Sequence, residues 1–116
     1  MSFQVRFALA AVASTIVASA TPAFAADVYK CVSDLKKFQE FDNDQSARAC
    51  SGLVNEDEVY KCVVDLKNYQ GFTNDSSADA CGGAVSADSV YKCVDELKKY
   101  QGFTNEQAAV ACRTAH

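Results

Sequence analysis

Apolar residues recur at helical spacing in three segments of the chain. In the first segment they are Val28, Cys31, Val32, Leu35 and Phe38. The same pattern returns in Val59, Cys62, Val63, Leu66 and Tyr69, and again in Val90, Cys93, Val94, Leu97 and Tyr100. Steps of three and four residues match the 3.6-residue period of the α-helix. Each segment therefore predicts a helix that buries this face.

The three segments belong to copies of one unit that repeats every 31 residues. The copies read VYKCVSDLKKFQEFDNDQSARAC from Val28, VYKCVVDLKNYQGFTNDSSADAC from Val59 and VYKCVDELKKYQGFTNEQAAVAC from Val90. Thirteen of the 23 aligned positions are identical in all three copies. Units of this length bury their apolar faces against one another. We therefore assign three repeats, at 26–54, 55–85 and 86–116.

Each repeat carries signals for a second, shorter helix after a turn. The first helix has stop signals at Gln39, Gly71 and Gly102. The residues that can cap the second helix are Asp42, Thr73 and Thr104, and Gln45 and Gln107 follow two of them at capping-box spacing. The second helix is expected to end near Cys50, Cys81 and Cys112, before Gly52 or the pair Gly82-Gly83.

Start signals for the first helix are present in the second and third repeats. Asn55 and Ser86 are suitable N-caps, and Glu58 is placed to complete a capping box with Asn55. Val54 and Val85 are placed to pack on the first turn of each helix as a hydrophobic staple. The sequence thus predicts an all-α protein of six short helices in three hairpins. Whether the hairpins stack as a small solenoid or close into a bundle stays open.

The cysteines occur once in each predicted helix, always 19 residues apart. Positions equally far from the turn of an antiparallel helix pair face each other, which favours three disulfides within repeats: Cys31–Cys50, Cys62–Cys81 and Cys93–Cys112. A hairpin of about 25 residues is too small to fold without such a staple. The chain contains neither the CxxC spacing of redox pairs nor closely spaced thiols for zinc. A structural role for the cysteines is therefore favoured over redox or metal chemistry.

Residues 1–25 have the features of a secretory signal peptide. Arg6 precedes an apolar run from Phe7 to Ala20, and small residues flank a cleavage position after Ala25. The run is shorter than the about 20 residues that span a bilayer. We therefore expect an exported protein, periplasmic or extracellular and of bacterial style, with no membrane span after cleavage. Export into an oxidising compartment agrees with the predicted disulfides.

Composition narrows the range of functions. The 11 basic and 15 acidic residues give a net charge of −4, which argues against nucleic-acid binding. The one histidine is His116, and no catalytic Ser-His-Asp or Cys-His arrangement or phosphate-binding loop is present. We therefore expect no enzymatic activity, no cofactor and no metal site.

Several polar and aromatic residues recur at positions outside the predicted core. The candidate binding surface comprises Tyr29, Lys30, Tyr60, Lys61, Tyr91, Lys92, Gln39, Gln70 and Gln101. Rings beside amide and ammonium groups suit a glycan or a peptide, and three equal sites on one frame would gain by avidity. Each residue also has a structural interpretation. The tyrosines would pack on a neighbouring repeat, and the lysines would form a solvated face.

Two further sets of recurring residues flank the turns. Phe41, Phe72 and Phe103 are expected to plug the open end of each hairpin. Asn43, Asn74 and Asn105 are expected to stabilise the start of the second helix.

The function that fits these features is a small exported, non-enzymatic scaffold that binds a partner protein or a cell-surface polymer such as a polysaccharide. One alternative is a secreted effector or enzyme inhibitor on the same rigid frame. A second alternative is a structural surface protein that assembles by self-association, because repeat arrays with similar end faces polymerise end to end.

Overall fold

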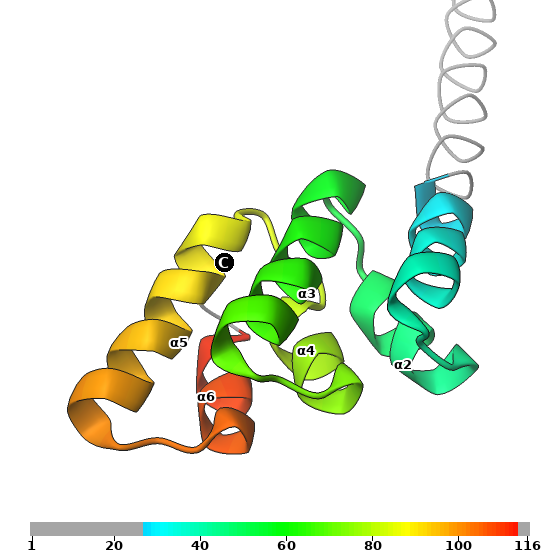
Figure 1. Cartoon of the computed structure of the whole chain (residues 1–116). Helices are drawn as coiled ribbons and strands as arrows, with labels where there is room; N and C mark the ends of the chain where they lie inside the picture. Colours follow the sequence, from blue (N-terminus) through cyan, green and yellow to red (C-terminus); the bar gives the residue numbers. More distant parts are fainter. Residues whose placement is uncertain (1–26, 114–116) are drawn as a thin grey trace, which may run out of the picture.

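The computed structural model describes residues 27–113, and the regular structure in this range is entirely α-helical (Figure 1). Residues 27–39 are helical. The helices that follow are α2 (Asn43–Cys50), α3 (Glu56–Gln70), α4 (Asn74–Cys81), α5 (Ala87–Gln101) and α6 (Asn105–Cys112). The prediction of an all-α protein with six short helices is confirmed. The predicted signal peptide and His116 lie outside the described residues.

A long and a short helix form a disulfide-linked hairpin in each repeat. The three pairs are those predicted: Cys31–Cys50, Cys62–Cys81 and Cys93–Cys112, with Cα atoms 5.9, 5.7 and 5.8 Å apart. Disulfides of this kind are typical of proteins in an oxidising environment. Within residues 27–113, no helix is both long and apolar enough to cross a membrane.

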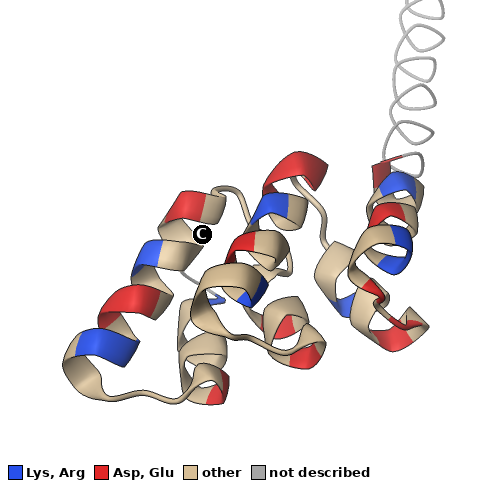
Figure 2. Cartoon of the chain, viewed as in Figure 1, with Lys and Arg blue, Asp and Glu red and all other residues tan. Residues whose placement is uncertain are grey.

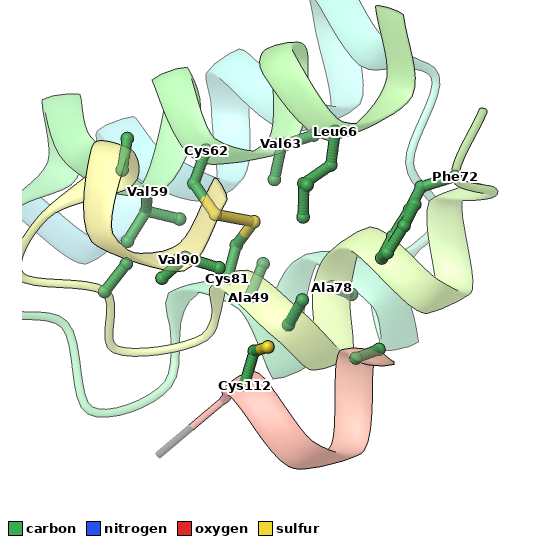
Figure 3. Packing of buried hydrophobic residues seen from close by; sticks show 14 of the residues in the cluster. Ala49, Val59, Cys62, Val63, Leu66, Phe72, Ala78, Cys81, Val90 and Cys112 are labelled. Carbon is green, nitrogen blue, oxygen red and sulfur yellow. A yellow bond between two sulfur atoms is a disulfide. The ribbon is translucent and has the colours of Figure 1, made fainter. Parts of the chain in front are cut away.

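The three hairpins stack in a row, so the structure is the solenoid-like alternative rather than a closed bundle. The long helices form one layer and the short helices a second layer below it (Figure 1). In the first layer α3 packs on α5, and in the second α4 packs on both α2 and α6. The core lies between the layers, where Val63 and Leu66 of α3 meet Ala78 and Cys81 of α4 (Figure 3). Each hairpin thus shares its core with the next one.

Side-chain caps start the helices where the sequence places them. The capping residues are Asp42, Thr73 and Thr104 for the short helices and Asn55 and Ser86 for α3 and α5. The two capping boxes predicted for the short helices, Asp42 with Gln45 and Thr104 with Gln107, are both present. These bonds satisfy backbone N–H groups that have no partner inside the helix.

Two predicted features of the long-helix starts are wrong. Glu58 donates its backbone N–H to Asn55 at 3.2 Å, but its carboxylate does not close the box. It accepts instead from the backbone N–H of Ala87 in the next repeat, at 2.7 Å. Val54 and Val85, expected as hydrophobic staples, are largely exposed. The Glu58 side chain thus links two repeats instead of capping its own helix.

The turn inside each hairpin is built around one residue with positive φ. Gly71 (φ 69°) and Gly102 (φ 68°) end the long helices as predicted, and Glu40 takes the same conformation (φ 59°) in the first repeat. In the second repeat the Leu66 carbonyl accepts from the backbone N–H groups of Gly71 and Phe72. Phe72, like its equivalent in the first repeat, is buried beside the turn. The predicted plugging of the hairpin end is therefore confirmed there.

Candidate functional site

The recurring tyrosines of the predicted binding surface differ in their surroundings. Tyr60 and Tyr91 are half-buried against the core, and the Tyr60 hydroxyl accepts a hydrogen bond from Gln39 Nε2 at 3.4 Å. Tyr29 of the first repeat is 78% exposed. Position in the stack, rather than local sequence, decides the exposure of these rings. The structural interpretation of Tyr60, packing on a neighbouring repeat, is confirmed by its hydrogen bond with Gln39, and Tyr91 packs on the core.

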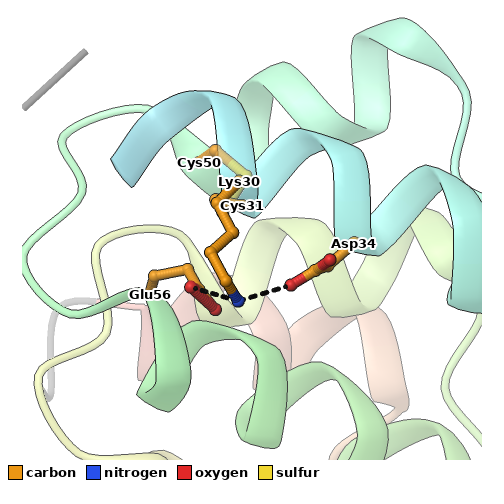
Figure 4. Close-up of a disulfide and its surroundings, with 5 residues drawn as sticks. All are labelled: Lys30, Cys31, Asp34, Cys50 and Glu56. Atoms are coloured by element: carbon orange, nitrogen blue, oxygen red, sulfur yellow. Dashed lines mark hydrogen bonds and ion pairs between the residues drawn. A yellow bond between two sulfur atoms is a disulfide. The ribbon is translucent and has the colours of Figure 1, made fainter. Parts of the chain in front are cut away.

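Two of the recurring lysines bridge adjacent repeats by ion pairs. Lys30 lies 3.0 Å from Asp34 of its own helix and 3.0 Å from Glu56 at the start of α3 (Figure 4). Lys61 repeats this arrangement with Asp65 at 3.2 Å and Asp88 at 2.8 Å. Figure 2 shows the acidic and basic segments that alternate along the long helices.

The acidic neighbours of these two lysines raise their pKa. Hydrogen bonds to Asp34 and then to Glu56 raise the pKa of Lys30 above its ordinary value of 10.5. For Lys61 the same effect comes first from Asp88 and then from Asp65. Both lysines are therefore cationic at neutral pH. Their ammonium groups already have carboxylate partners within the chain.

The recurring glutamines supply acceptors at the C-terminal ends of the long helices. The backbone carbonyl of Gln39 accepts from Lys67 Nζ at 3.1 Å. The backbone carbonyl of Gln70 accepts from Lys98 Nζ at 3.0 Å. Carbonyls at a helix C-terminus have no partner within the helix and attract cations. Each of these lysines thus anchors its repeat on the helix end of the repeat before it.

The recurring asparagines and phenylalanines complete the same contact. Asn74 Nδ2 donates to the Glu40 carbonyl at 3.2 Å, and Asn105 Nδ2 donates to the Gly71 carbonyl at 3.2 Å. The ammonium of Lys67 also lies over the Phe41 ring, 5.7 Å from its centroid, and that of Lys98 lies over the Phe72 ring at 5.8 Å. The expected role of these asparagines, support of their own short helix, is wrong because their amides reach the preceding repeat.

We call the contact between the hairpin of residues 27–50 and the α3–α4 hairpin the first joint, and the contact between α3–α4 and α5–α6 the second joint. Most of the residues predicted as a binding surface lie in these joints. The exposed members are Tyr29, Lys30, Lys61, Lys92 and Gln101. Residues that recur in every repeat can belong either to the contacts between repeats or to a binding surface. Recurrence in the sequence alone therefore does not distinguish the two roles.

A set of exposed aromatic rings stands elsewhere, at a position that the helical pattern assigns to the core. Phe38, Tyr69 and Tyr100 are 59%, 73% and 71% exposed, so their predicted burial is wrong. Ten residues separate Phe38 from Val28, which turns it about 80° away from the direction of Val28 on a helix of 100° per residue. The position therefore lies at the margin of the buried face.

These rings form one ridge with polar neighbours. The long helices lie side by side and run in the same direction (Figure 1), so equivalent positions share one surface. Lys37 Nζ lies 5.4 Å from the Phe38 ring centroid, and Lys99 Nζ lies 5.8 Å from that of Tyr100. We define the aromatic ridge as the residues Phe38, Tyr69 and Tyr100 with their neighbours Lys37, Asn68 and Lys99. It offers stacking faces together with hydrogen-bond donors and positive charge.

All six cysteines lie in the part of the chain that the structure describes, and all six are in disulfides. Within residues 27–113, no group of three or more His, Cys, Asp or Glu side chains is arranged to hold a metal ion.

The fold and these surfaces define a class of protein: a tandem array of helical hairpins, each held by one disulfide and joined to the next by backbone-directed lysine and asparagine contacts. Comparison of the chain with protein-family models, curated proteins and solved structures finds no match.

Proposed function

We propose that the protein is an exported, non-enzymatic binding scaffold whose aromatic ridge recognises a cell-surface polymer. The observation that carries the proposal is one exposed ring at the same position of every repeat, in Phe38, Tyr69 and Tyr100. Exposed aromatic residues that gather on one surface commonly mark interaction sites. Disulfides and joints hold the helices that carry these rings, so little conformational entropy is lost when a ligand binds.

A polymer with a regular repeat fits this surface better than a compact ligand. Each ring with its neighbouring lysine or asparagine makes a small site that binds weakly by itself. Three such sites on one frame raise the affinity for a chain that reaches all of them, because the second and third contacts are intramolecular. A polysaccharide supplies flat apolar faces for stacking and hydroxyls for Lys37, Asn68 and Lys99. A partner protein is the other ligand class that such a ridge can serve.

Export is part of the same proposal. The three disulfides favour an oxidising compartment, and the predicted signal peptide of residues 1–25 provides the route to it. The scaffold would then act in the periplasm or outside a bacterial cell. There the disulfides stabilise a stack that is small for its exposed surface.

Co-sedimentation with insoluble bacterial cell-wall polysaccharide tests the binding surface. We expect Tyr69→Ala to weaken binding several-fold, and the triple variant Phe38→Ala, Tyr69→Ala, Tyr100→Ala to weaken it at least a hundredfold, through loss of stacking and avidity. Val85→Ser, an exposed apolar residue in a loop, is the matched control and should bind like the parent. Unchanged binding by the triple variant would overturn the ridge as the site.

Treatment of whole cell envelopes identifies the class of ligand. Periodate oxidation cleaves vicinal diols, so it should abolish binding to a polysaccharide that carries them, whereas digestion of envelope proteins should leave binding intact. Loss of binding after proteolysis alone would assign the ridge to a partner protein instead. Tyr69→Phe keeps the stacking face without the hydroxyl, so it should retain most of the affinity.

A further inference from the structure

The two ends of the stack expose opposite halves of a joint. At the first repeat the exposed half is the one that faces backward along the stack, toward a preceding hairpin. Val59, Val90, Ala78 and Ala109, which face backward in the later repeats, are at most 1% exposed. Their first-repeat equivalents, Val28 and Ala47, are exposed. We call this exposed surface the front face.

At the third repeat the exposed half is the one that faces forward. Leu35 and Leu66 are fully buried by the hairpin that follows them, whereas Leu97 is only half-buried. Ala49 and Ala80 are likewise fully buried, whereas their equivalent, Ala111, is exposed. We call this exposed surface of α5 and α6 the back face. The front and back faces are thus different surfaces, and each is the complement of the other in the internal joints.

We propose that copies of this protein associate head to tail, with the back face of one copy on the front face of the next in the geometry of the internal joints. A contact between two unlike faces that does not close on itself produces open chains of copies. The inference does not depend on the proposed ligand, because the three rings of the aromatic ridge take no part in it and only its Lys37 borders the front face.

The donors and acceptors left at the two faces match. In the internal joints, Lys67 and Asn74 bond to the carbonyls of the preceding turn. Their first-repeat equivalents, Lys36 and Asn43, bond to each other, Nζ to Oδ1, at 2.7 Å. At the back face, Gln101 and Gly102 are the equivalents of Gln70 and Gly71, whose carbonyls accept hydrogen bonds from Asn105 at the second joint. In the associated state Lys36 and Asn43 turn to these carbonyls of the neighbouring copy.

The apolar parts of the two faces also match. The front face is hollowed, with a cavity of about 390 Å³ lined by Tyr29, Val32, Ser33, Lys36 and Lys37. At the same positions in the second repeat, Tyr60 packs on the core and Val63 is fully buried. Phe103 is the half-buried equivalent of Phe41, the ring over which Lys67 lies in the first joint. A neighbouring copy would cover the front-face hollow and bring its own Phe103 under Lys36.

Sedimentation velocity on the exported, oxidised protein tests the association. Because a contact between separate molecules loses translational and rotational entropy, we expect assembly over about 10 µM to about 1 mM. The mean mass should rise with concentration beyond that of a dimer, without a plateau. A monomer throughout this range, or a dimer that grows no further, would overturn the proposal.

Two charge variants separate head-to-tail stacking from other association. Ala47→Lys blocks the front face and Ala111→Lys blocks the back face; both positions are exposed, so the hairpins should fold unchanged by circular dichroism. Each variant alone should stay monomeric. Their equimolar mixture should form dimers and nothing larger, because each copy retains one usable face. Polymers of either single variant, or a purely monomeric mixture, would contradict the proposal. Tyr69→Ala on the ridge should assemble like the parent.

Discussion

The two joints of the stack share their bonds to the backbone and one lysine ion pair, and they differ in other bonds between side chains. In both, a lysine and an asparagine of one repeat donate to carbonyls at the turn of the repeat before it. The first joint adds Arg48, paired with Asp75 at 2.9 Å and Asp79 at 3.2 Å. The second adds a bond from Gln70 Nε2 to Asp95 at 3.1 Å.

The comparison distinguishes the contacts that both joints use from those that differ between them. A backbone carbonyl is present whatever side chain the residue carries, so a lysine that uses it keeps its acceptor when the preceding repeat changes in sequence. Exposed ion pairs contribute little and need two matching residues. The bonds to the backbone therefore define the joint. The other side-chain bonds vary around it, apart from the pairs of Lys30 with Glu56 and of Lys61 with Asp88.

The largest effect is expected from the disulfide of the hairpin that takes part in both joints. Replacing Cys62 and Cys81 by alanine opens a loop of about 18 residues, whose closure is worth about 3 kcal/mol of chain entropy. Since α3 and α4 pack on both neighbours, the whole stack should unfold in one transition at a Tm lower by about 10–20 °C. Differential scanning calorimetry measures both the shift and the number of transitions.

The terminal hairpin is the matched comparison for that variant. Replacing Cys93 and Cys112 by alanine opens a loop of the same length in a hairpin that takes part in one joint only. We expect α5 and α6 to unfold first, in a separate transition, with the first joint intact. Equal effects of the two double variants would contradict the view that the central hairpin couples both joints.

The next largest effect is expected at the C-terminal end of α4, where the two joints differ. A Cβ atom on Gly82 would lie 2.7 Å from the Arg48 carbonyl oxygen, so Gly82→Ala should destabilise the protein by about 2 kcal/mol, within the usual range for overpacking. Arg113 occupies the equivalent place in the third repeat and carries a side chain there. The close approach is thus specific to the first joint.

Urea denaturation measures this effect, with Ser51→Ala as its control. Ser51 is the exposed equivalent of Gly82 in the first repeat and should change the free energy of unfolding by less than about 0.5 kcal/mol. A neutral Gly82→Ala would show that α2 and α4 separate at no cost at this point.

Features that depend on a few neighbouring residues could be predicted from the sequence. The Thr104–Gln107 capping box and the Gly71 turn need only local geometry, and the constant spacing of the cysteines fixes their pairing once the hairpin is recognised. The joints could not be assigned in this way. The sequence around Lys67 does not indicate whether its ammonium group faces solvent or bonds to a carbonyl 28 residues earlier in the chain.

The aromatic ridge illustrates a different reason for a wrong prediction. A hydrophobic pattern records which residues are apolar, and Tyr69 is apolar enough to complete the helical face of α3. Its exposure follows from its place at the margin of the buried face of α3. A signal was available in the angle of this position, at the margin of the face, rather than in its residue type.

A smaller effect, of opposite sign, would make the first joint more like the second. Glu40 occupies the positive-φ position that glycine fills at 71 and 102, and its Cβ makes this conformation unfavourable. We expect Glu40→Gly to stabilise the protein by about 0.5–1 kcal/mol, since the relief of strain exceeds the entropy that glycine adds to the unfolded chain. Chemical denaturation measures the gain. Glu40→Gln removes the charge but keeps the Cβ, so an equal gain in that variant would assign the effect to charge instead.

The smallest effect concerns the lysine pairs across the joints and shows itself as a dependence on pH. Bonds to Asp88 and Asp65 raise the pKa of Lys61 in the folded protein above 10.5, so its contribution to stability is complete below pH 10.5 and is lost as the pH rises through the folded-state value. Thermal melts between pH 7 and pH 12 should therefore show a smaller alkaline loss of stability for Lys61→Met than for the parent. Lys92→Met removes the same charge from the exposed end of the stack and should follow the parent curve. Identical curves for the parent and Lys61→Met would mean that the pairs with Asp65 and Asp88 add nothing to the stability of the protein.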